Sequence, residues 1–201
     1  MKEIRKDMQV NGYASKNDFR DLILNDTQSP LDIRRTVLKT ACIDTILGAM
    51  IAIADEESLY LLEFVARHGL EREIDRLRAR GFAIIAGTTA PLQLIEAELT
   101  SYFSRQLKQF ETPYHLWGSL FQQQVWKALC DIPFGETRTY AQQALSMGKP
   151  KAYRAVANAN SANHLAIIVP CHRIIRCDGQ LGGYNGGIAI KQWLLKHETA
   201  L

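Results

Sequence analysis

The stretch Ile167-Ile168-Val169-Pro170-Cys171-His172-Arg173-Ile174-Ile175 places a cysteine and a histidine between two apolar, β-branched runs. Such runs predict buried strand, or the edge of one, on both sides of the pair. Pro170 fixes its own φ and lacks a backbone N–H, so the chain must leave a regular ladder where the thiol appears. We therefore predict that Cys171 lies at the rim of a packed core, where a nucleophile would be presented.

Two interpretations of Cys171 follow from these residues. Most free cysteines are small buried hydrophobes, and Cys171 fits that class. A reactive cysteine needs a base or a positive neighbour, because a thiol with a pKa near ~8.5 is only slightly ionised at neutral pH. His172 is a candidate base. A loop with five glycines in nine positions follows at residues 179–187. It allows a ligand to approach the backbone closely, although a flexible surface loop uses the same residues.

Length and composition limit the class of protein. The chain has 201 residues, 47% of them apolar, which is enough for one large or two small domains. It has no apolar run of the ~20 residues that a membrane span needs and no signal-peptide pattern, so we expect an intracellular protein without membrane contact. The four cysteines are not spaced like metal ligands. We expect a reducing compartment and no bound metal.

Charge is distributed unevenly along the chain. The net charge is only +3, but the residues before Gly118 carry 15 Lys+Arg against 17 Asp+Glu, and those from Gly118 onward carry 9 against 4. The basic excess therefore accompanies the cysteine, which is typical of a half that faces phosphate. Uneven solvated charge without a partner is the alternative.

The first half predicts a small α/β domain. Residues 44–54 and 59–65 read as a strand hairpin, 70–80 as a charged helix closed by Gly81, 82–86 as a short strand, and about 92–110 as an amphipathic helix. Thr112-Pro113 breaks the pattern. We therefore predict a polar arm over 1–40, a small α/β domain over 41–113 and a second domain over 114–201.

The second half predicts a mainly helical domain. Phe121, Val125, Leu129 and Ile132 recur at helical spacing, and a final helix is expected over about 190–199. Helices over 139–145 and 151–161 flank the turn residues 148–150, which is the pattern of a helix-turn-helix. The predicted fold is thus an α/β domain followed by a winged-helix-like, helix-turn-helix domain that carries the cysteine.

The second helix of this pair is unusually slim and basic. Ala152 and Ala155 lie beside Lys151 and Arg154. An alanine-rich helix packs closely against neighbours, which is one interpretation. A slim basic helix also fits the DNA minor groove, about 6 Å wide, where sequence is read poorly. The second interpretation predicts binding to double-stranded DNA with little sequence preference.

Four sequence motifs, taken in their order along the chain, resemble those of one family, the O6-alkylguanine-DNA alkyltransferases. They are Phe121-Gln122-Gln123-Gln124-Val125-Trp126, Ile132-Pro133-Phe134-Gly135-Glu136-Thr137, Pro170-Cys171-His172-Arg173 and Gly183-Tyr184-Asn185-Gly186-Gly187. The resemblance runs from about residue 42 to the C-terminus and is close from Gly118 onward. It implies direct-reversal DNA repair by irreversible transfer of an alkyl group, without a cofactor, in a cytoplasmic monomer.

The resemblance also implies a role for each matching residue. Cys171 is the alkyl acceptor, His172 takes its proton through a water, and Glu198 orients the imidazole. Tyr140 donates to the base as guanine leaves, and Asn163 is a hinge between the recognition helix and the active-site segment. Taken singly, Tyr140, Asn163 and Glu198 also fit structural roles, and their joint spacing around the cysteine favours a site.

The remaining matches concern DNA and the alkyl pocket. The resemblance implies that Arg154 fills the space left by a flipped-out nucleotide, which repair of a stacked base requires. It places Pro170, Tyr184, Asn185 and Gly186 around the alkyl group. Many relatives have serine or alanine where this chain has Asn185, so the pocket is expected to differ in size.

Two other functions and one further motif remain open. A DNA-binding regulator would only recognise the lesion, although relatives of that kind lack the cysteine. A Cys-His hydrolase would turn over on an ester or amide, but would not need the slim basic helix. Gly12-Tyr13 and Ser29-Pro30 resemble the end of an AraC-type helix-turn-helix, and a solvated helical arm is the alternative for these residues.

Overall fold

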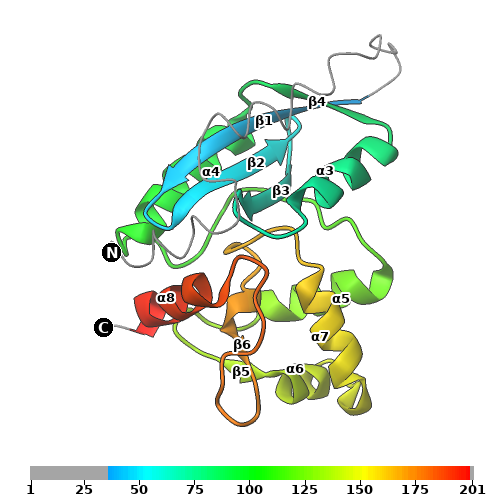
Figure 1. Cartoon of the computed structure of the whole chain (residues 1–201), viewed down its shortest axis with the longest axis vertical. Coiled ribbons are helices and arrows are strands. Elements are labelled where there is room, and N and C mark those ends of the chain that lie inside the picture. The colour runs from blue at the N-terminus through cyan, green and yellow to red at the C-terminus, as the bar shows by residue number, and fades with distance from the viewer. Residues whose placement is uncertain (1–35, 200–201) are drawn as a thin grey trace. The chain divides into compact units, whose positions relative to one another are not determined.

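The computed structural model describes residues 36–199, which form two compact units that divide between His115 and Leu116 (Figure 1). The predicted AraC-like motif lies outside the described residues. The end of the predicted polar arm is wrong, because residues 36–40 belong to a strand. Leu38 and Thr40 both face inward: Leu38 is fully buried, and the buried Thr40 donates its hydroxyl to the Ala52 carbonyl. A polar residue on the buried side therefore made this strand look like part of the arm.

A four-stranded sheet forms the first unit, in the order β3-β2-β1-β4. The strands are β1 (Thr36–Thr45), β2 (Gly48–Ala54), β3 (Leu59–Phe64) and β4 (Phe82–Ala86). β2 pairs antiparallel with β1 and β3, whereas β4 runs parallel to β1. The predicted single strand over 44–54 is wrong, because a turn interrupts it. Thr45 makes this turn by accepting from Leu47 N and donating to the Gly48 carbonyl.

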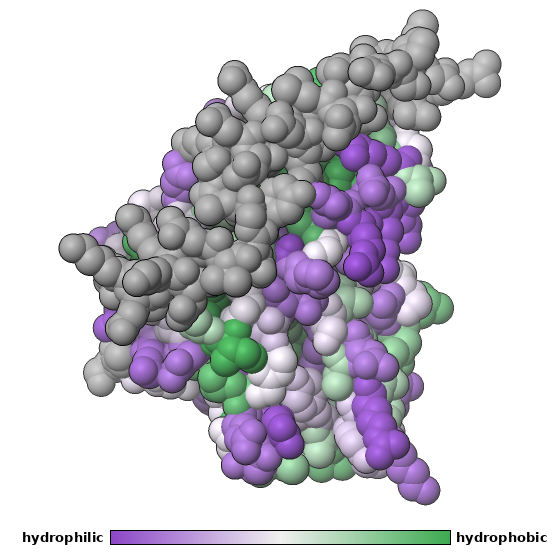
Figure 2. All heavy atoms as spheres, viewed as in Figure 1, coloured by the Kyte–Doolittle hydropathy of each residue, from purple (hydrophilic) through white to green (hydrophobic). Residues whose placement is uncertain are grey.

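Two helices accompany the sheet. α3 (Leu70–Ala79) contacts β4, and α4 (Ala90–Phe103) packs against β1 and β2. Figure 2 shows hydrophilic side chains gathered over α3, whose buried residues lie on the other face. α4 begins earlier than predicted because Thr89 caps Leu92 N, and it ends earlier because Arg105 adopts a positive φ of 63°.

The second unit is mainly helical. Its elements are α5 (Leu120–Cys130), β5 (Arg138–Thr139), α6 (Tyr140–Ser146), η2 (Pro150–Ala152), α7 (Tyr153–Ser161), η3 (Cys171–Arg173), β6 (Ile174–Ile175) and α8 (Ile188–Thr199). Capping boxes start α5 at Ser119 and α6 at Thr139, each with a glutamine three residues on. The predicted fold class is confirmed.

Buried hydrogen bonds fix the face that α7 turns outward. Trp126 Nε1 of α5 donates to the Ala159 carbonyl at 2.8 Å, and the Asn160 amide donates to Gln143 of α6 at 2.7 Å. Val156, Ala159 and Asn160 are therefore buried. Residues three and four apart share a helix face, so these three form one buried face. Arg154, the basic residue of α7, lies off this face and is exposed. None of the helices between residues 36 and 199 is long and apolar enough to cross a membrane.

Candidate active site

A tight turn presents Cys171. Pro170 has φ −82° and ψ 58°, and Cys171 N donates to the Val169 carbonyl at 2.8 Å, which together make an inverse γ-turn. Cys171 then opens the 3-10 turn η3 and is half-buried. The strand predicted before the cysteine is wrong. Residues 166–169 form buried turns, and Ile167 has a φ of 71°, which is strained for a β-branched residue.

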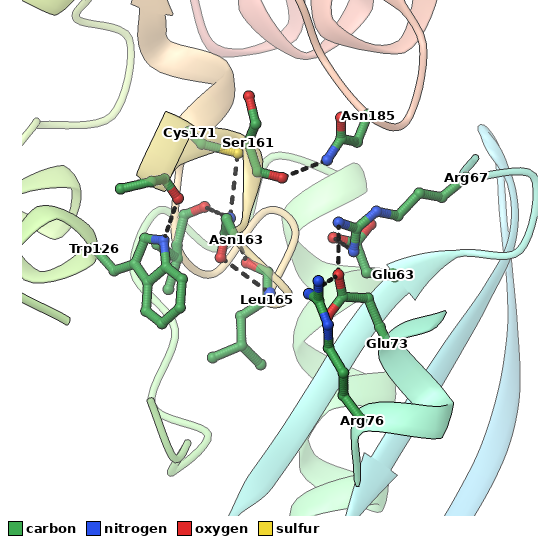
Figure 3. A network of polar contacts seen from close by, with 12 residues as sticks. Glu63, Arg67, Glu73, Arg76, Trp126, Ser161, Asn163, Leu165, Cys171 and Asn185 are labelled. Carbon is green, nitrogen blue, oxygen red and sulfur yellow. Dashed lines mark hydrogen bonds and ion pairs between the residues drawn. The ribbon is translucent and has the colours of Figure 1, made fainter. Parts of the chain in front are cut away.

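Asn163 holds this turn in place. Its side chain is buried, and Nδ2 lies 2.9 Å from the Val169 carbonyl, 3.4 Å from the Leu165 carbonyl and 3.2 Å from Cys171 Sγ (Figure 3). Its Oδ1 accepts from Leu165 N at 3.0 Å. One amide therefore ties the loop after α7 to the thiol, and donates toward the atom on which negative charge would develop.

His172 and Glu198 form a buried pair. His172 Nε2 lies 2.9 Å from Glu198 Oε1, and the imidazole is fully buried. Burial, helped by the charges of Arg173 and Lys191, lowers the pKa of His172 below its ordinary value although Glu198 opposes it, so the ring is neutral at rest. Since Glu198 can only accept, the proton sits on Nε2. Nδ1 makes no hydrogen bond to any described residue, and its lone pair is available to take a proton.

Arg173 completes the surroundings of Glu198. Its Nε and Nη2 donate to the two carboxylate oxygens at 2.8 and 3.0 Å, and its Nη1 donates to the Ile132 carbonyl. Burial opposes ionisation of Glu198, but the bonds from His172 and Arg173 outweigh it and hold the pKa of Glu198 well below its ordinary value. Gly135 N also donates to Glu198, and a Cβ at this glycine would approach the Glu198 carbonyl to 3.0 Å. Sequence reasoning missed Arg173, although it stands in a quoted motif.

Tyr140 lies beside the glycine-rich loop. It is the first residue of α6, and a Cβ at Gly182 would lie 3.2 Å from its hydroxyl. Gly182 also has a φ of 70°, so both space and backbone favour glycine there. Burial and the charge of Cys171 raise the pKa of Tyr140, while Arg176 lowers it. The phenol therefore keeps its proton near the thiol and can donate it.

The other residues predicted for the pocket lie on this loop or next to the cysteine. Asn185 is exposed, but its amide donates to the Ser161 carbonyl at the end of α7 (Figure 3). Tyr184 and Gly186 are half-buried, and Pro170 is buried. The Asn185 bond links the loop to the end of α7, a connection that the sequence did not indicate.

The predicted DNA-binding residues lie in η2, which carries Lys151 and Ala152, and in the first turn of α7, which carries Arg154 and Ala155. Lys151, Arg154 and Ala155 are exposed and Ala152 is half-buried. The Arg154 guanidinium lies 5.7 Å from the centroid of the Tyr153 ring, a cation–π distance. Within residues 36–199, no three His, Cys, Asp or Glu side chains are grouped so as to hold a metal ion.

A cysteine beside a buried histidine–glutamate pair, in a helix-turn-helix unit that exposes Lys151 and Arg154 around the start of its second helix, defines a DNA-binding protein with a nucleophilic thiol. Residues 120–200 match the family described as the 6-O-methylguanine DNA methyltransferase DNA binding domain. A methylated-DNA–protein-cysteine methyltransferase of Methanosarcina barkeri is 42% identical over 157 residues, covering 78% of this chain and 94% of that protein. The chain therefore belongs to the methylated-DNA–protein-cysteine methyltransferase family, and the predicted resemblance is confirmed.

Two further comparisons bear on the fold and the relatives. The bifunctional transcriptional activator/DNA repair enzyme Ada of Escherichia coli is 49% identical over 118 residues, covering 57% of this chain and 33% of that protein. The crystal structure of Mycobacterium tuberculosis OGT in complex with DNA has a TM-score of 0.69 at 36% identity, covering 82% of this chain and 94% of that one. The two-unit architecture is thus that of a solved relative bound to DNA.

Proposed function

We propose that this protein repairs alkylated DNA by direct reversal, moving the alkyl group of O6-alkylguanine to Cys171. The observation that carries the proposal is the contact of Cys171 Sγ with the Asn163 amide at 3.2 Å, next in sequence to a neutral, buried His172. That arrangement combines a donor to the thiolate with a base for the thiol proton.

The proton and the electrons balance without a cofactor. The thiol proton passes to His172 Nδ1, directly or through a water, and Glu198 stabilises the imidazolium that forms. The thiolate attacks the alkyl carbon, a carbon–sulfur bond forms, and the bond from that carbon to O6 breaks. The electron pair of the broken bond goes to the guanine, which takes a proton from the Tyr140 hydroxyl as it leaves. The proton that His172 took from the thiol then returns through water to the Tyr140 oxygen, so both side chains end neutral.

The product is a thioether, which no residue of this site can cleave. One molecule therefore repairs one lesion. O4-alkylthymine offers the same alkyl–oxygen bond on a smaller base, and we expect it to react more slowly. A hydrolase would instead regenerate its thiol, and a regulator that only recognises the lesion would leave the thiol unmodified.

DNA binding is assigned to α7. Its exposed start enters the minor groove, where little sequence is read, and the target base rotates out of the stack to reach Cys171. Arg154 is long enough to occupy the space that the base leaves. We also infer that the protein acts as a monomer and works in the cytoplasm, where its thiol stays reduced.

The test is intact-protein mass after mixing with excess duplex that carries one O6-methylguanine. We expect a gain of one methyl group, mapped to the Cys171 peptide and absent from Cys171→Ala. Cys177→Ala removes an exposed cysteine of the same unit and serves as the matched control, which should still gain the methyl group. DNA binding without a mass change would overturn the proposal in favour of a regulator, and repeated turnover on an ester would favour a hydrolase.

A further inference from the structure

Tyr153 is an aromatic residue on the surface of the second unit. Of the Phe, Trp and Tyr side chains between residues 36 and 199, it alone is exposed, with 43% of its surface accessible to solvent. It is the first residue of α7, and its helix neighbour Val156 is fully buried. Single exposed apolar side chains are common on protein surfaces, so the groups beside this ring decide what its exposure means.

Two basic residues are close neighbours of Tyr153 in the chain. Lys151 precedes it by two residues, Arg154 follows it directly, and both are exposed. The Arg154 guanidinium carbon lies 5.7 Å from the centre of the Tyr153 ring, which is a cation–π distance. No carboxylate of the described residues forms an ion pair with Arg154. The tyrosine ring is therefore the group that orders this guanidinium in the absence of DNA.

The ring is too large for the surface on which it lies. Its other neighbours there, Ala152 and Ala155, have the smallest side chains that carry a Cβ. The side chains of a helix lean toward its N-terminus, so a ring on the first residue of α7 leans toward η2 and the exposed basic residues. The minor groove of B-DNA is about 6 Å wide, which suits alanine but leaves no room for a phenol ring against the groove floor. The ring fits only where the duplex has been opened.

We propose that Tyr153 stacks on the base that borders the gap in the opened duplex, while Arg154 occupies the gap itself. The inference rests on the proposed function, in which the target base leaves the stack. Extrusion exposes one face of each neighbouring base, and an aromatic ring replaces the stacking partner that the base has lost. Minor-groove proteins insert large side chains at steps that they unstack in the same way. Tyr153 is thus a positioning residue that acts on the duplex and not on the alkyl group.

The contact with Arg154 couples the two side chains. An arginine that enters the duplex loses rotamer freedom, and a guanidinium already held against a ring has less of that freedom to lose. The guanidinium is planar and stacks on aromatic faces, so ring and guanidinium can enter the opened step together.

The first experiment measures stacking without methyl transfer. A duplex carries an abasic site in place of the target nucleotide, with the fluorescent base 2-aminopurine next to it, on the 5′ side in one duplex and on the 3′ side in another. This base is bright beside an abasic site and is quenched when a ring stacks on it. Saturating wild-type protein and Tyr153→Phe should quench one of the two duplexes, and Tyr153→Ala should leave that duplex bright. Leu120→Ala is the matched control, because Leu120 is an exposed apolar residue that begins another helix, α5, and it should quench as the wild-type protein does.

The second experiment measures single-turnover methyl transfer at saturating protein, from O6-methylguanine in a duplex and in the same sequence as a single strand. We expect Tyr153→Ala to slow transfer from the duplex by about tenfold, which lies in the range that one base stacked on an aromatic ring contributes. Transfer from the single strand should be nearly unchanged, because little stacking has to be broken there. Tyr153→Phe should keep the wild-type rate on both substrates.

Three results would overturn the inference. The first is equal 2-aminopurine fluorescence with the wild-type protein and Tyr153→Ala in both duplexes. The second is a Tyr153→Ala rate that matches Leu120→Ala on the duplex, or that falls by the same factor on both substrates, as a ring that only supports the fold of α7 predicts. The third is Tyr153→Phe behaving like Tyr153→Ala, since the hydroxyl and not the stacked ring would then be required.

The fluorescence measurement needs no reaction at Cys171, so the two proposals fail in different ways. If the wild-type protein gains no methyl group from O6-methylguanine, the proposed function is wrong, while the 2-aminopurine signal still decides whether Tyr153 stacks. If methyl transfer occurs and Tyr153→Ala quenches as the wild-type protein does, only the role of Tyr153 is wrong.

Discussion

Glu198→Gln tests how far the buried polar cluster supports the second unit. The substitution keeps the shape of the side chain but removes its charge, and it places an amide NH₂ where Arg173 or His172 now donates. Arg173 is then a buried guanidinium without a counter-charge. Breaking a buried ion pair in this way costs about 3–5 kcal/mol. That is a large part of the stability of an ordinary domain, about 5–15 kcal/mol.

The assay is urea denaturation followed by tryptophan fluorescence. All three tryptophans of the chain, Trp117, Trp126 and Trp193, lie after His115, so the signal reports the second unit alone. We expect a lower midpoint with an unchanged slope, which marks a loss of stability rather than a different unfolded state. Glu136→Gln is the control, because it breaks a 2.7 Å pair with Arg138 that is about half exposed. An exposed pair contributes about 0–1 kcal/mol.

If Glu198→Gln lowers the free energy of unfolding by no more than the control does, the charge of Glu198 is not required for the stability of the second unit. The double variant Arg173→Met, Glu198→Gln gives an independent check. It removes the unpaired guanidinium together with its partner, so it should be less destabilised than the sum of the two single variants. Additive losses would mean that the two residues act separately.

Three more outcomes can be measured. Asn163→Ala removes the hydrogen-bond donor to Cys171 Sγ. A hydrogen bond to a charged group contributes about 1.5–3 kcal/mol, so single-turnover methyl transfer should slow by about ten- to a hundredfold. An unchanged rate would show that this hydrogen bond does not support the reaction. Asn185→Ser breaks the bond to the Ser161 carbonyl and shortens the pocket wall, which should raise the ratio of O6-butyl to O6-methyl transfer rates. Burial raises the pKa of Glu63 from its ordinary 4.5 to about 7. The free energy of unfolding should therefore fall as the pH rises from about 4.5 to about 7. Urea midpoints from far-ultraviolet circular dichroism should show this fall, and Glu63→Gln should abolish it.

The helices of the second unit were predictable because their ends are encoded locally. Ser119 and Thr139 are each followed three residues later by a glutamine, and both capping boxes form. The turn at 148–150 separates α6 from α7 as predicted. Sequence reasoning extended α7 back to Lys151, where the structure has the short 3-10 turn η2, because Pro150 starts a turn that only becomes α-helical at Tyr153.

The segment before the cysteine was not predictable from β-propensity. Residues 167–169 are β-branched and buried, which is typical of a strand, yet no strand within residues 36–199 pairs with them. Their carbonyl groups need partners, and Asn163 supplies one for Val169. The Asn163 side chain, six residues earlier in the sequence, thus supplies a hydrogen bond that a neighbouring strand would otherwise supply. The pattern of apolar residues does not indicate this bond.

Lys191 and Arg173 show the same limit for charge. From sequence, a lysine or arginine is expected to be solvent-exposed unless it belongs to a motif with a known role. Both residues are buried here. A local signal did exist for Lys191, because it shares a helix face with Leu194 and Glu198, at spacings of three and seven. A lysine that shares the apolar face of a helix with an acidic residue indicates that charged groups are buried in the core, because a solvent-facing lysine would lie on the opposite face.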